Sequence, residues 1–325
     1  MASVSELEKL SRIVLDLYNS PPREPAPAFR QRALDELAPY LPYTGAAWAH
    51  GVMTPRGAVF HDILVRGLSP GFADAVRATA DLDSTSHKLA AASGQSFIHV
   101  QDDYPPEVRQ LAGDPDDLCS SLEGMVADGT TGVFSSVCLF RNSRQPAFSE
   151  TERVLHQNLL PHWIAALSRR IIDDAFIAAR GVATANLAVA VAGKDGALEA
   201  ASEGFAALLR TEWPSWPGGS LPPELLRSAV RTESTFLGDR VVARISRLPE
   251  RMLLCARARL PVDSLGRREL QVAELLGAGL GVKPAAKKLG LSPSTVENHR
   301  DHIYRKLGVS SRSALIAVLR ESALV

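Results

Sequence analysis

The chain has 325 residues, 46% of them hydrophobic and 22% charged, a composition typical of a globular protein of two or three domains. Its 36 basic residues equal its 36 acidic residues. From Pro261 onward ten Lys and Arg stand against six Asp and Glu, giving +4, whereas residues 1–260 hold 26 against 30, giving −4. The positive charge therefore gathers in the C-terminal segment, where contact with a polyanion is expected.

Several classes of protein are excluded by what the sequence lacks. No apolar run approaches the roughly 18 residues that a membrane-spanning helix needs, and the N-terminal sequence MASVSELEKL lacks the layout of a signal peptide. The three cysteines, Cys119, Cys138 and Cys255, are widely spaced, so they indicate neither a disulfide framework nor a zinc site. We expect a cytoplasmic protein with no metal or cofactor.

Residues 1–148 are predicted to form an α+β domain. Two helices, 4–18 and 29–40, precede strands at 45–53, 58–67 and 95–100, and a last strand at 130–142 follows a loop-rich acidic segment. This order, closed by Phe148-Ser149-Glu150 at the start of a helix, resembles the GAF family of small-molecule sensor domains.

The resemblance to GAF domains implies a ligand pocket between the sheet and its covering helices. We expect the pocket to be lined by aromatic, histidine and cysteine side chains of the predicted strands, namely Trp48, His50, Phe60, His61, Phe97, His99, Phe134 and Cys138. The alternative is that these residues form the core of a domain that senses nothing and only dimerises.

A long helix is predicted over residues 149–180. Ser149 and Glu152 have the spacing of a capping box, which fixes the helix start. Apolar residues then recur at close to heptad spacing for about thirty residues, which favours a connecting helix that pairs with a second copy. Pro161 is expected to bend or interrupt it. The alternative is a helix packed wholly on its own domain.

Residues 181–258 are predicted to form a smaller α+β module. Turns at Lys194-Asp195-Gly196 and Gly238-Asp239 each join two short strands, and a last strand follows. This order resembles a compact PAS domain. Its helical middle is largely replaced by a loop that contains Pro214, Pro217, Pro222 and Pro223, so a signal relay or a dimer contact is a plainer role than a cofactor pocket.

Residues 259–325 are predicted to form an all-α domain of four helices, at 265–280, 283–290, 293–307 and 311–322. Ser292 is expected to cap the third helix, Pro293 to occupy its first turn, and Gly308 to end it. Val296, Ile303 and Leu307 would face the core. A short second helix, a tight turn and a third, polar helix make a helix-turn-helix arrangement.

The C-terminal segment contains, in one order and without a gap, Leu265, Arg268, Glu269, Val272, Leu275, Leu276, Gly279, Leu280, Lys283, Ala286, Leu289, Leu291, Ser292, Thr295, Val296, His299, Ile303, Lys306, Leu307, Gly308, Val309 and Arg312. In these residues the segment resembles the DNA-binding domain of LuxR-type transcription factors. Two positions depart from the family pattern, because Glu297 stands where a basic residue is frequent and Pro284 stands where an acidic one is common.

The resemblance implies that the third helix contacts DNA. A carboxylate can accept a hydrogen bond from cytosine and an Asn side chain can pair with adenine, so Glu297, Asn298 and Asp301 are the candidates for base readout. We expect phosphate contacts from Lys283, Lys287, Lys288, Thr295, Arg300, Arg305, Lys306 and Arg312. Val296 and His299 complete the predicted DNA-binding set.

Together the sequence predicts a homodimeric transcription regulator rather than an enzyme. It would bind double-stranded DNA at a palindromic operator, under the control of an N-terminal domain that senses a small molecule. Two other classes stay open. A redox sensor would act through Cys138 or Cys119, and an enzyme hidden in the N-terminal domain would turn over a small molecule, although no catalytic constellation is visible for it.

Overall fold

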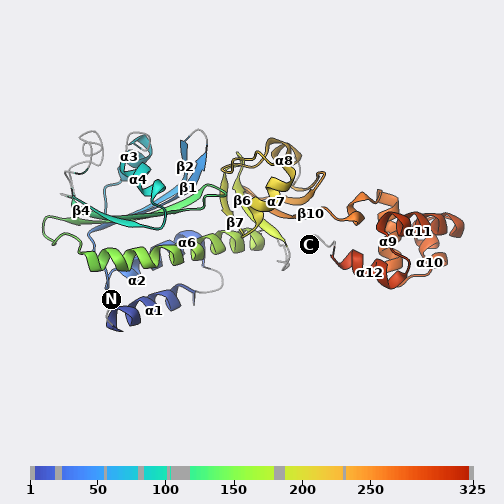
Figure 1. The fold of residues 1–325 in the computed structure, drawn as a ribbon, viewed down its shortest axis with the longest axis horizontal. Helices are drawn as coiled ribbons and strands as arrows, with labels where there is room; N and C mark the ends of the chain where they lie inside the picture. The colour runs from blue at the N-terminus through green and yellow to red at the C-terminus, as the bar shows by residue number, and fades with distance from the viewer. Residues whose placement is uncertain are drawn as a thin grey trace.

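The computed structural model describes residues 4–18, 24–54, 57–79, 84–100, 103, 118–178, 187–229 and 232–321. Along the long axis of the molecule follow a first sheet with its helices, a second, smaller sheet, and a helical domain (Figure 1). The predicted boundary between residues 180 and 181 lies outside the described residues.

The first sheet is antiparallel and has the strand order β2-β1-β5-β4-β3. Its strands are β1 (Gly45–Thr54), β2 (Gly57–Arg66), β3 (Ser96–Val100), β4 (Leu118–Ala127) and β5 (Val133–Asn142). Four of them occupy the predicted positions. The fifth, β4, was not predicted, because its sequence LCSSLEGMVA has polar residues at its centre, among them Ser121 and Glu123, which are nevertheless buried.

Helices cover the first sheet. Those named here are α1 (Val4–Tyr18), α2 (Ala26–Leu37), α3 (Phe72–Thr79), α4 (Ser84–Ala91) and α6 (Glu150–Ala178). Trp48 of β1 is fully buried between Trp163 of α6 and Phe29 of α2, with ring centroids 6.0 and 6.2 Å away. The core of the domain therefore lies between the sheet and these two helices, and α1 packs on the outside of α6 (Figure 1).

The long helix α6 begins as predicted. Ser149 N–H donates to Glu152 Oε2 at 2.8 Å and Glu152 N–H donates to Ser149 Oγ at 3.4 Å, which confirms the capping box. Pro161 lies inside α6 and does not interrupt it.

The apolar side chains of α6 lie in the chain's own core. Leu159, Trp163, Ala166, Ile171 and Ala175 are at most 5% exposed, and the same core contains residues of both sheets. Burial of these residues therefore matches the alternative, a helix packed on its own chain. Pairing of α6 with a second copy stays a prediction.

The second sheet has the order β7-β6-β10-β9-β8, which repeats the connectivity of the first. Its elements are β6 (Ala188–Gly193), β7 (Leu198–Ala201), α7 (Phe205–Glu212), α8 (Pro223–Ser228), β8 (Glu233–Leu237), β9 (Val241–Arg247) and β10 (Arg251–Ala258). Both predicted turns are confirmed: Asp195 Oδ1 accepts from Ala197 N–H at 3.0 Å, and Gly238 N–H donates to Val241 O at 2.9 Å. A PAS-like assignment stays a prediction.

The C-terminal domain is helical, as predicted. A 3-10 turn, η2 (Pro261–Ser264), leads into α9 (Arg267–Gly277), α10 (Val282–Leu289), α11 (Pro293–Leu307) and α12 (Arg312–Glu321). These elements enclose a separate core that includes Val272, Leu276, Val296 and Ile303. Among the described residues, no helix is long and apolar enough to cross a membrane.

Candidate nucleic-acid interface

The turn between α10 and α11 is fixed by local contacts that the sequence specifies. Gly290 ends α10 with φ of 64°, a backbone conformation that costs glycine little. Ser292 caps α11, because its Oγ accepts a hydrogen bond from Thr295 N–H at 3.1 Å. Gly308 ends α11 with φ of 65°. The helix therefore starts and ends where the sequence predicted.

One side of α11 is anchored in the domain core. Val296 and Ile303 are completely buried, and Leu307 is 8% exposed. Val296 was predicted to be part of the DNA-binding set, and this prediction is wrong, because a side chain enclosed by its own domain cannot reach a base edge. What Val296 does instead is fix the rotation of α11, which turns Glu297 and Asn298 outward.

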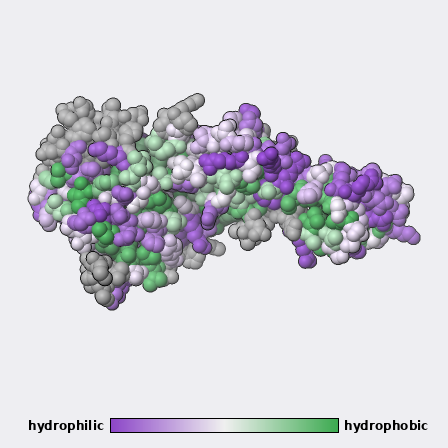
Figure 2. Space-filling model, in the orientation of Figure 1, coloured by the Kyte–Doolittle hydropathy of each residue, from purple (hydrophilic) through white to green (hydrophobic). Residues whose placement is uncertain are grey.

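The outward side of α11 and of α10 is polar. Glu297, Asn298, Asp301 and Arg305 of α11 are exposed, as are Lys283, Lys287 and Lys288 of α10. Hydrophilic residues gather along the outer edge of this domain (Figure 2). In the part of the chain that the structure describes, none of these three lysines, nor Arg305, is in an ion pair, so these cations are available to phosphates.

Three predicted phosphate contacts are engaged within the protein. Lys306 Nζ lies 2.7 Å from Glu269 Oε2, and Arg312 Nε donates to Leu276 O at 2.8 Å. Arg300 Nη2 lies 2.9 Å from Asp301 Oδ1. Arg312 therefore holds the end of α9. Arg300 occupies only Oδ1 of Asp301, so Oδ2 can still accept a hydrogen bond from a base.

Thr295 and His299, which complete the predicted set, are half-buried.

Lys306 and the N–H of Gly266 together hold the pKa of Glu269 below its usual range. Glu269 thus caps α9 and ties it to α11 through Lys306.

Two residues at this interface were not predicted to have a role. Ser294 Oγ lies 2.8 Å from Ser292 Oγ in the exposed first turn of α11, where hydroxyls and free N–H groups can meet a phosphate. Arg268 Nη2 donates to Leu289 O at 2.5 Å, which holds the end of α10. The three-residue spacing between Gly266 and Glu269 is a sequence signal that could have predicted the start of α9.

The residues predicted to line a sensor pocket do not share one face of the first sheet. Trp48 and His50 lie on the face toward α6, whereas Phe60 and Phe134 meet on the opposite face, with ring centroids 5.6 Å apart. By strand register, Phe97, His99 and Cys138 belong to the Phe134 side. Phe97 packs there with Phe60 around buried Leu89 and Met125. The structure thus brings five of the eight residues to one face.

Two of the other three candidates, His50 and His61, contact the second sheet. His50 Nε2 donates to Glu199 O at 2.8 Å, and His61 Nε2 donates to Leu198 O at 2.7 Å. His50 Nδ1 accepts from the hydroxyl of Ser135 at 2.9 Å. Burial and the neighbouring His61 lower the pKa of His50 to about 3, so this histidine is neutral and structural.

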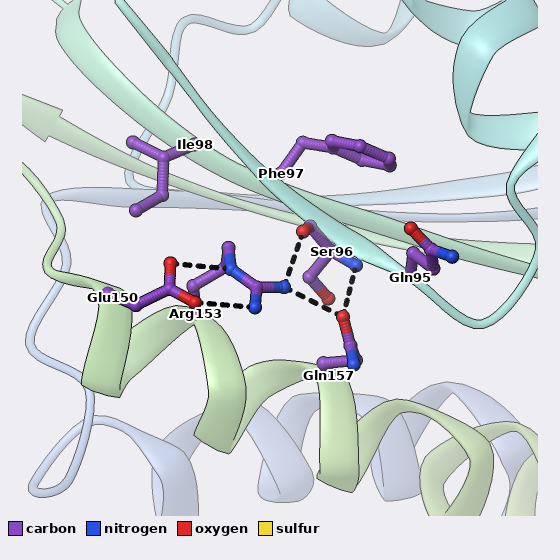
Figure 3. A pocket seen from close by; sticks show the side chains of 7 residues that line it. All are labelled: Gln95, Ser96, Phe97, Ile98, Glu150, Arg153 and Gln157. Carbon is purple, nitrogen blue, oxygen red and sulfur yellow. Dashed lines mark hydrogen bonds and ion pairs between the residues drawn. The ribbon is translucent and has the colours of Figure 1, made fainter.

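An open depression of about 610 Å³ lies between β3 and α6 (Figure 3). Phe97 is the one predicted sensor residue that lines it. The polar groups in it bind one another: Arg153 Nη1 donates to Ser96 O at 3.0 Å and to Gln157 Oε1 at 2.7 Å, and the rest of its guanidinium binds Glu150. Because Ser96 N–H also donates to Gln157, these side chains protect an edge strand rather than await a ligand.

The cysteines differ in burial. Cys255 is buried, and burial raises the pKa of its thiol to about 11, so it is not a reactive thiolate at neutral pH. Cys119 and Cys138 are half-buried.

The helical domain matches the sequence model described as "Bacterial regulatory proteins, luxR family" over residues 263–319. This segment belongs to the luxR family. The segment is 55% identical over 49 residues to the transcriptional regulatory protein UhpA of Escherichia coli, and the aligned residues make up 15% of this chain and 25% of UhpA. A putative HTH-type transcriptional regulator of Aeromonas salmonicida is 40% identical over 93 residues, 29% of this chain and 41% of that protein. The chain therefore spans less than half of the relatives that its LuxR-type domain resembles.

Solved structures show a weaker likeness over longer stretches. The match to Escherichia coli SdiA covers 97% of this chain and 96% of the SdiA chain, at 11% identity and a TM-score of 0.41. A GAF domain from an Acinetobacter phosphoenolpyruvate-protein phosphotransferase covers 52% of this chain and 95% of its own at 12% identity, with a TM-score of 0.36. The α+β description of the N-terminal domain rests on its own sheet and helices.

Proposed function

We propose that the chain is a sequence-specific DNA-binding transcription regulator. The observation that carries this proposal is the exposed side of α11, where Glu297, Asn298 and Arg305 face outward beside the unpaired lysines of α10. Such a face provides base-reading groups in the middle and phosphate-binding cations at the rim, which is the arrangement that a helix in the major groove needs.

The proposal extends to a homodimer on a palindromic operator. One α11 reaches only a few base pairs, and the segment from Pro261 carries a net charge of only +4. Two copies bound one helical turn apart would double both the base contacts and the phosphate contacts. Where the copies meet is open to experiment, because the apolar side of α6 is used within the chain.

We further propose that the first sheet and its helices form a sensor domain that controls DNA binding, in a cytoplasmic protein that is not an enzyme. The face bearing Phe60, Phe97 and Phe134 is the candidate contact for a small-molecule signal. The buried core on this face, Leu89, Met125 and Phe134, is smaller than the core that contains Trp48 on the other face. A signal would act by binding one arrangement of the chain better than another.

The test is selection of genomic fragments by the purified full-length protein, with its mass measured in solution. Recovery of a palindromic motif by a protein of twice the chain mass supports the proposal. Recovery of no motif, with binding that depends only on duplex length and salt, would contradict sequence-specific recognition.

A further inference from the structure

The two sheets are built as one body. Val191, Ala200 and Leu253 of the second sheet belong to the same buried core as Trp48 and Trp163 of the first domain. The helix α6 runs beneath the first sheet and reaches the second (Figure 1). Separating the sheets would expose this shared apolar surface to water, which is unfavourable.

Hydrogen bonds also cross between the two sheets. Besides the bonds from His50 and His61 to the backbone of β7, Gly219 N–H donates to Thr131 O at 2.7 Å. His50 is 5% exposed, so its hydrogen bond to Glu199 O lies in a buried site, and a small displacement of one sheet from the other would break it before water could replace it. A change in the first domain is therefore transmitted to the second as movement of one body.

The LuxR-type domain is joined to this body differently. Its core is separate from both sheets and includes Val262 of η2, which is 4% exposed. Asp263, the next residue, therefore moves with the LuxR-type domain, whereas Arg257 is part of β10. Arg259 still belongs to the two-sheet body, since its N–H donates to Arg240 O at 2.6 Å and its Nη1 to Gly238 O at 2.8 Å. The joint between the two parts therefore consists of Leu260 and Pro261.

An ion pair closes over that joint. Arg257 Nη1 and Nη2 donate to Asp263 Oδ2 and Oδ1 at 2.6 and 2.8 Å, and the two side chains are 10% and 11% exposed. Both guanidinium bonds run to one carboxylate, so the pair fixes an orientation as well as a distance. Although burial alone would raise it, the pKa of Asp263 lies below its usual range because Arg257 and the N–H of Leu260 stabilise the carboxylate.

We propose that Arg257 and Asp263 are positioning residues that hold the LuxR-type domain in a fixed orientation on the two-sheet body, and that the joint they close is where the two parts move. Holding the domain in this way sets how far apart and at what angle the α11 helices of two copies lie. That consequence for DNA rests on the proposed function, whereas the ion pair and the joint do not.

The test uses the full-length protein and trypsin. Asp263→Asn removes the charge, keeps an acceptor for Leu260 N–H, and leaves the cleavage site after Arg259 intact. Cleavage of a protected segment tracks the population in which it is open, so we expect about tenfold faster cleavage at this site. Asp263→Glu, which restores a carboxylate, should bring the rate back toward that of the wild type. X-ray scattering of the Asn variant should show a larger radius of gyration.

The matched control is Glu233→Gln, which removes the carboxylate of an ion pair within the second sheet, 3.1 Å from Arg244 Nε. It should leave cleavage in the joint unchanged. Arg257→Gln breaks the same ion pair from outside the LuxR-type domain, so faster cleavage at Arg259 in this variant excludes damage to that domain as the cause. Unchanged cleavage in both Asp263→Asn and Arg257→Gln would overturn the proposal.

DNA binding is measured separately on the same proteins. If the wild type binds no specific site but Asp263→Asn opens the joint, the proposed function fails and the positioning pair stands. If the wild type selects a site but neither variant opens the joint, the positioning pair fails and the proposed function stands.

Discussion

Lys306 Nζ on α11 lies 2.7 Å from Glu269 Oε2 at the start of α9. The same carboxylate oxygen accepts from Gly266 N–H at 2.8 Å, so one acidic side chain caps α9 and holds a basic side chain of the proposed DNA-reading helix. The Lys306 side chain is 45% exposed, so DNA can reach it although it is already in an ion pair. Neighbouring basic residues on α11 therefore differ in how freely they can contact a DNA phosphate.

The first prediction compares Arg305 with Lys306. Arg305→Ala should weaken binding equally on all sequences and lower the slope of log affinity against log salt by about 0.9, the effect of one lost phosphate contact. Lys306→Ala should have a smaller effect on the slope, because Lys306 must leave Glu269 to reach a phosphate. Titration of one duplex over a range of salt concentrations measures both slopes.

Arg12→Ala is the control for these two variants, since Arg12 is an exposed basic residue on α1, at the far end of the molecule (Figure 1). Its salt slope should equal that of the wild type. A larger loss of slope in Lys306→Ala than in Arg305→Ala would contradict this reading of the ion pair.

The second prediction concerns Asn298, which is exposed in the first half of α11. Asn298→Ala should relax the preference at one base pair of each half-site and cost about 1–3 kcal/mol on the preferred sequence. Selection from a randomised duplex library, repeated with the variant, measures the preference at every position. A uniform loss across all sequences, as expected for Arg305→Ala, would show that Asn298 anchors the helix rather than reads a base.

The third prediction concerns Arg312, which was expected to contact phosphate but donates to Leu276 O. Arg312→Ala should lower the free energy of unfolding of the LuxR-type domain by about 1–2 kcal/mol, since a charged donor to a helix-end carbonyl is lost. Urea unfolding followed by circular dichroism measures the change. Arg320, exposed in the last turn of α12, offers the matched control, and equal stability of the Arg312→Ala and Arg320→Ala variants would refute the structural role.

The fourth prediction concerns acid stability. Burial lowers the pKa of His50 and of His156 to about 3. In the unfolded chain each histidine binds a proton with a pKa near 6.5, whereas in the folded chain it stays neutral down to about pH 3. The unfolded state therefore binds more protons as the pH drops below about 6.5, and stability falls. At pH 5 each histidine should reduce the free energy of unfolding by roughly 2 kcal/mol relative to pH 7.

Urea unfolding at pH 7 and at pH 5 tests this directly. His156→Gln should lessen the difference between the two pH values even if it lowers stability at both, because the titrating group is gone. His302→Gln, a substitution at an exposed position of α11, should leave the difference unchanged. A pH dependence that survives in His156→Gln at full size would assign it to other groups.

Local sequence signals predicted the LuxR-type domain well. The position of α11 follows from Ser292, Pro293 and Gly308, whose effects act within a few residues of the chain. The spacing of Val296, Ile303 and Leu307 also predicted that Val296 faces the core. Val296 was nevertheless kept among the proposed DNA contacts, and the packed structure shows that its burial excludes this role for its side chain.

Contacts between distant segments were predicted less well. The spacing of Leu159, Trp163 and Ile171 is the same whether α6 packs on another copy or on its own sheets, so the sequence could not choose between them. The sensor candidates were divided between two faces because strand register decides which way each side chain points. In β2 an extra residue, His61, stands opposite the His50–Gly51 step of β1, and this irregularity shifts the register between the two strands.

The measurement that tests the central claim most directly is the affinity ratio of the full-length protein for its selected fragment and for a scrambled duplex of equal length, at about 0.15 M salt. Sequence reading by α11 predicts a ratio of at least about a thousandfold, reduced by Asn298→Ala and retained by Arg12→Ala. Equal affinity for the two duplexes would contradict the claim, since it would mean that the exposed face of α11 holds phosphates and reads no bases.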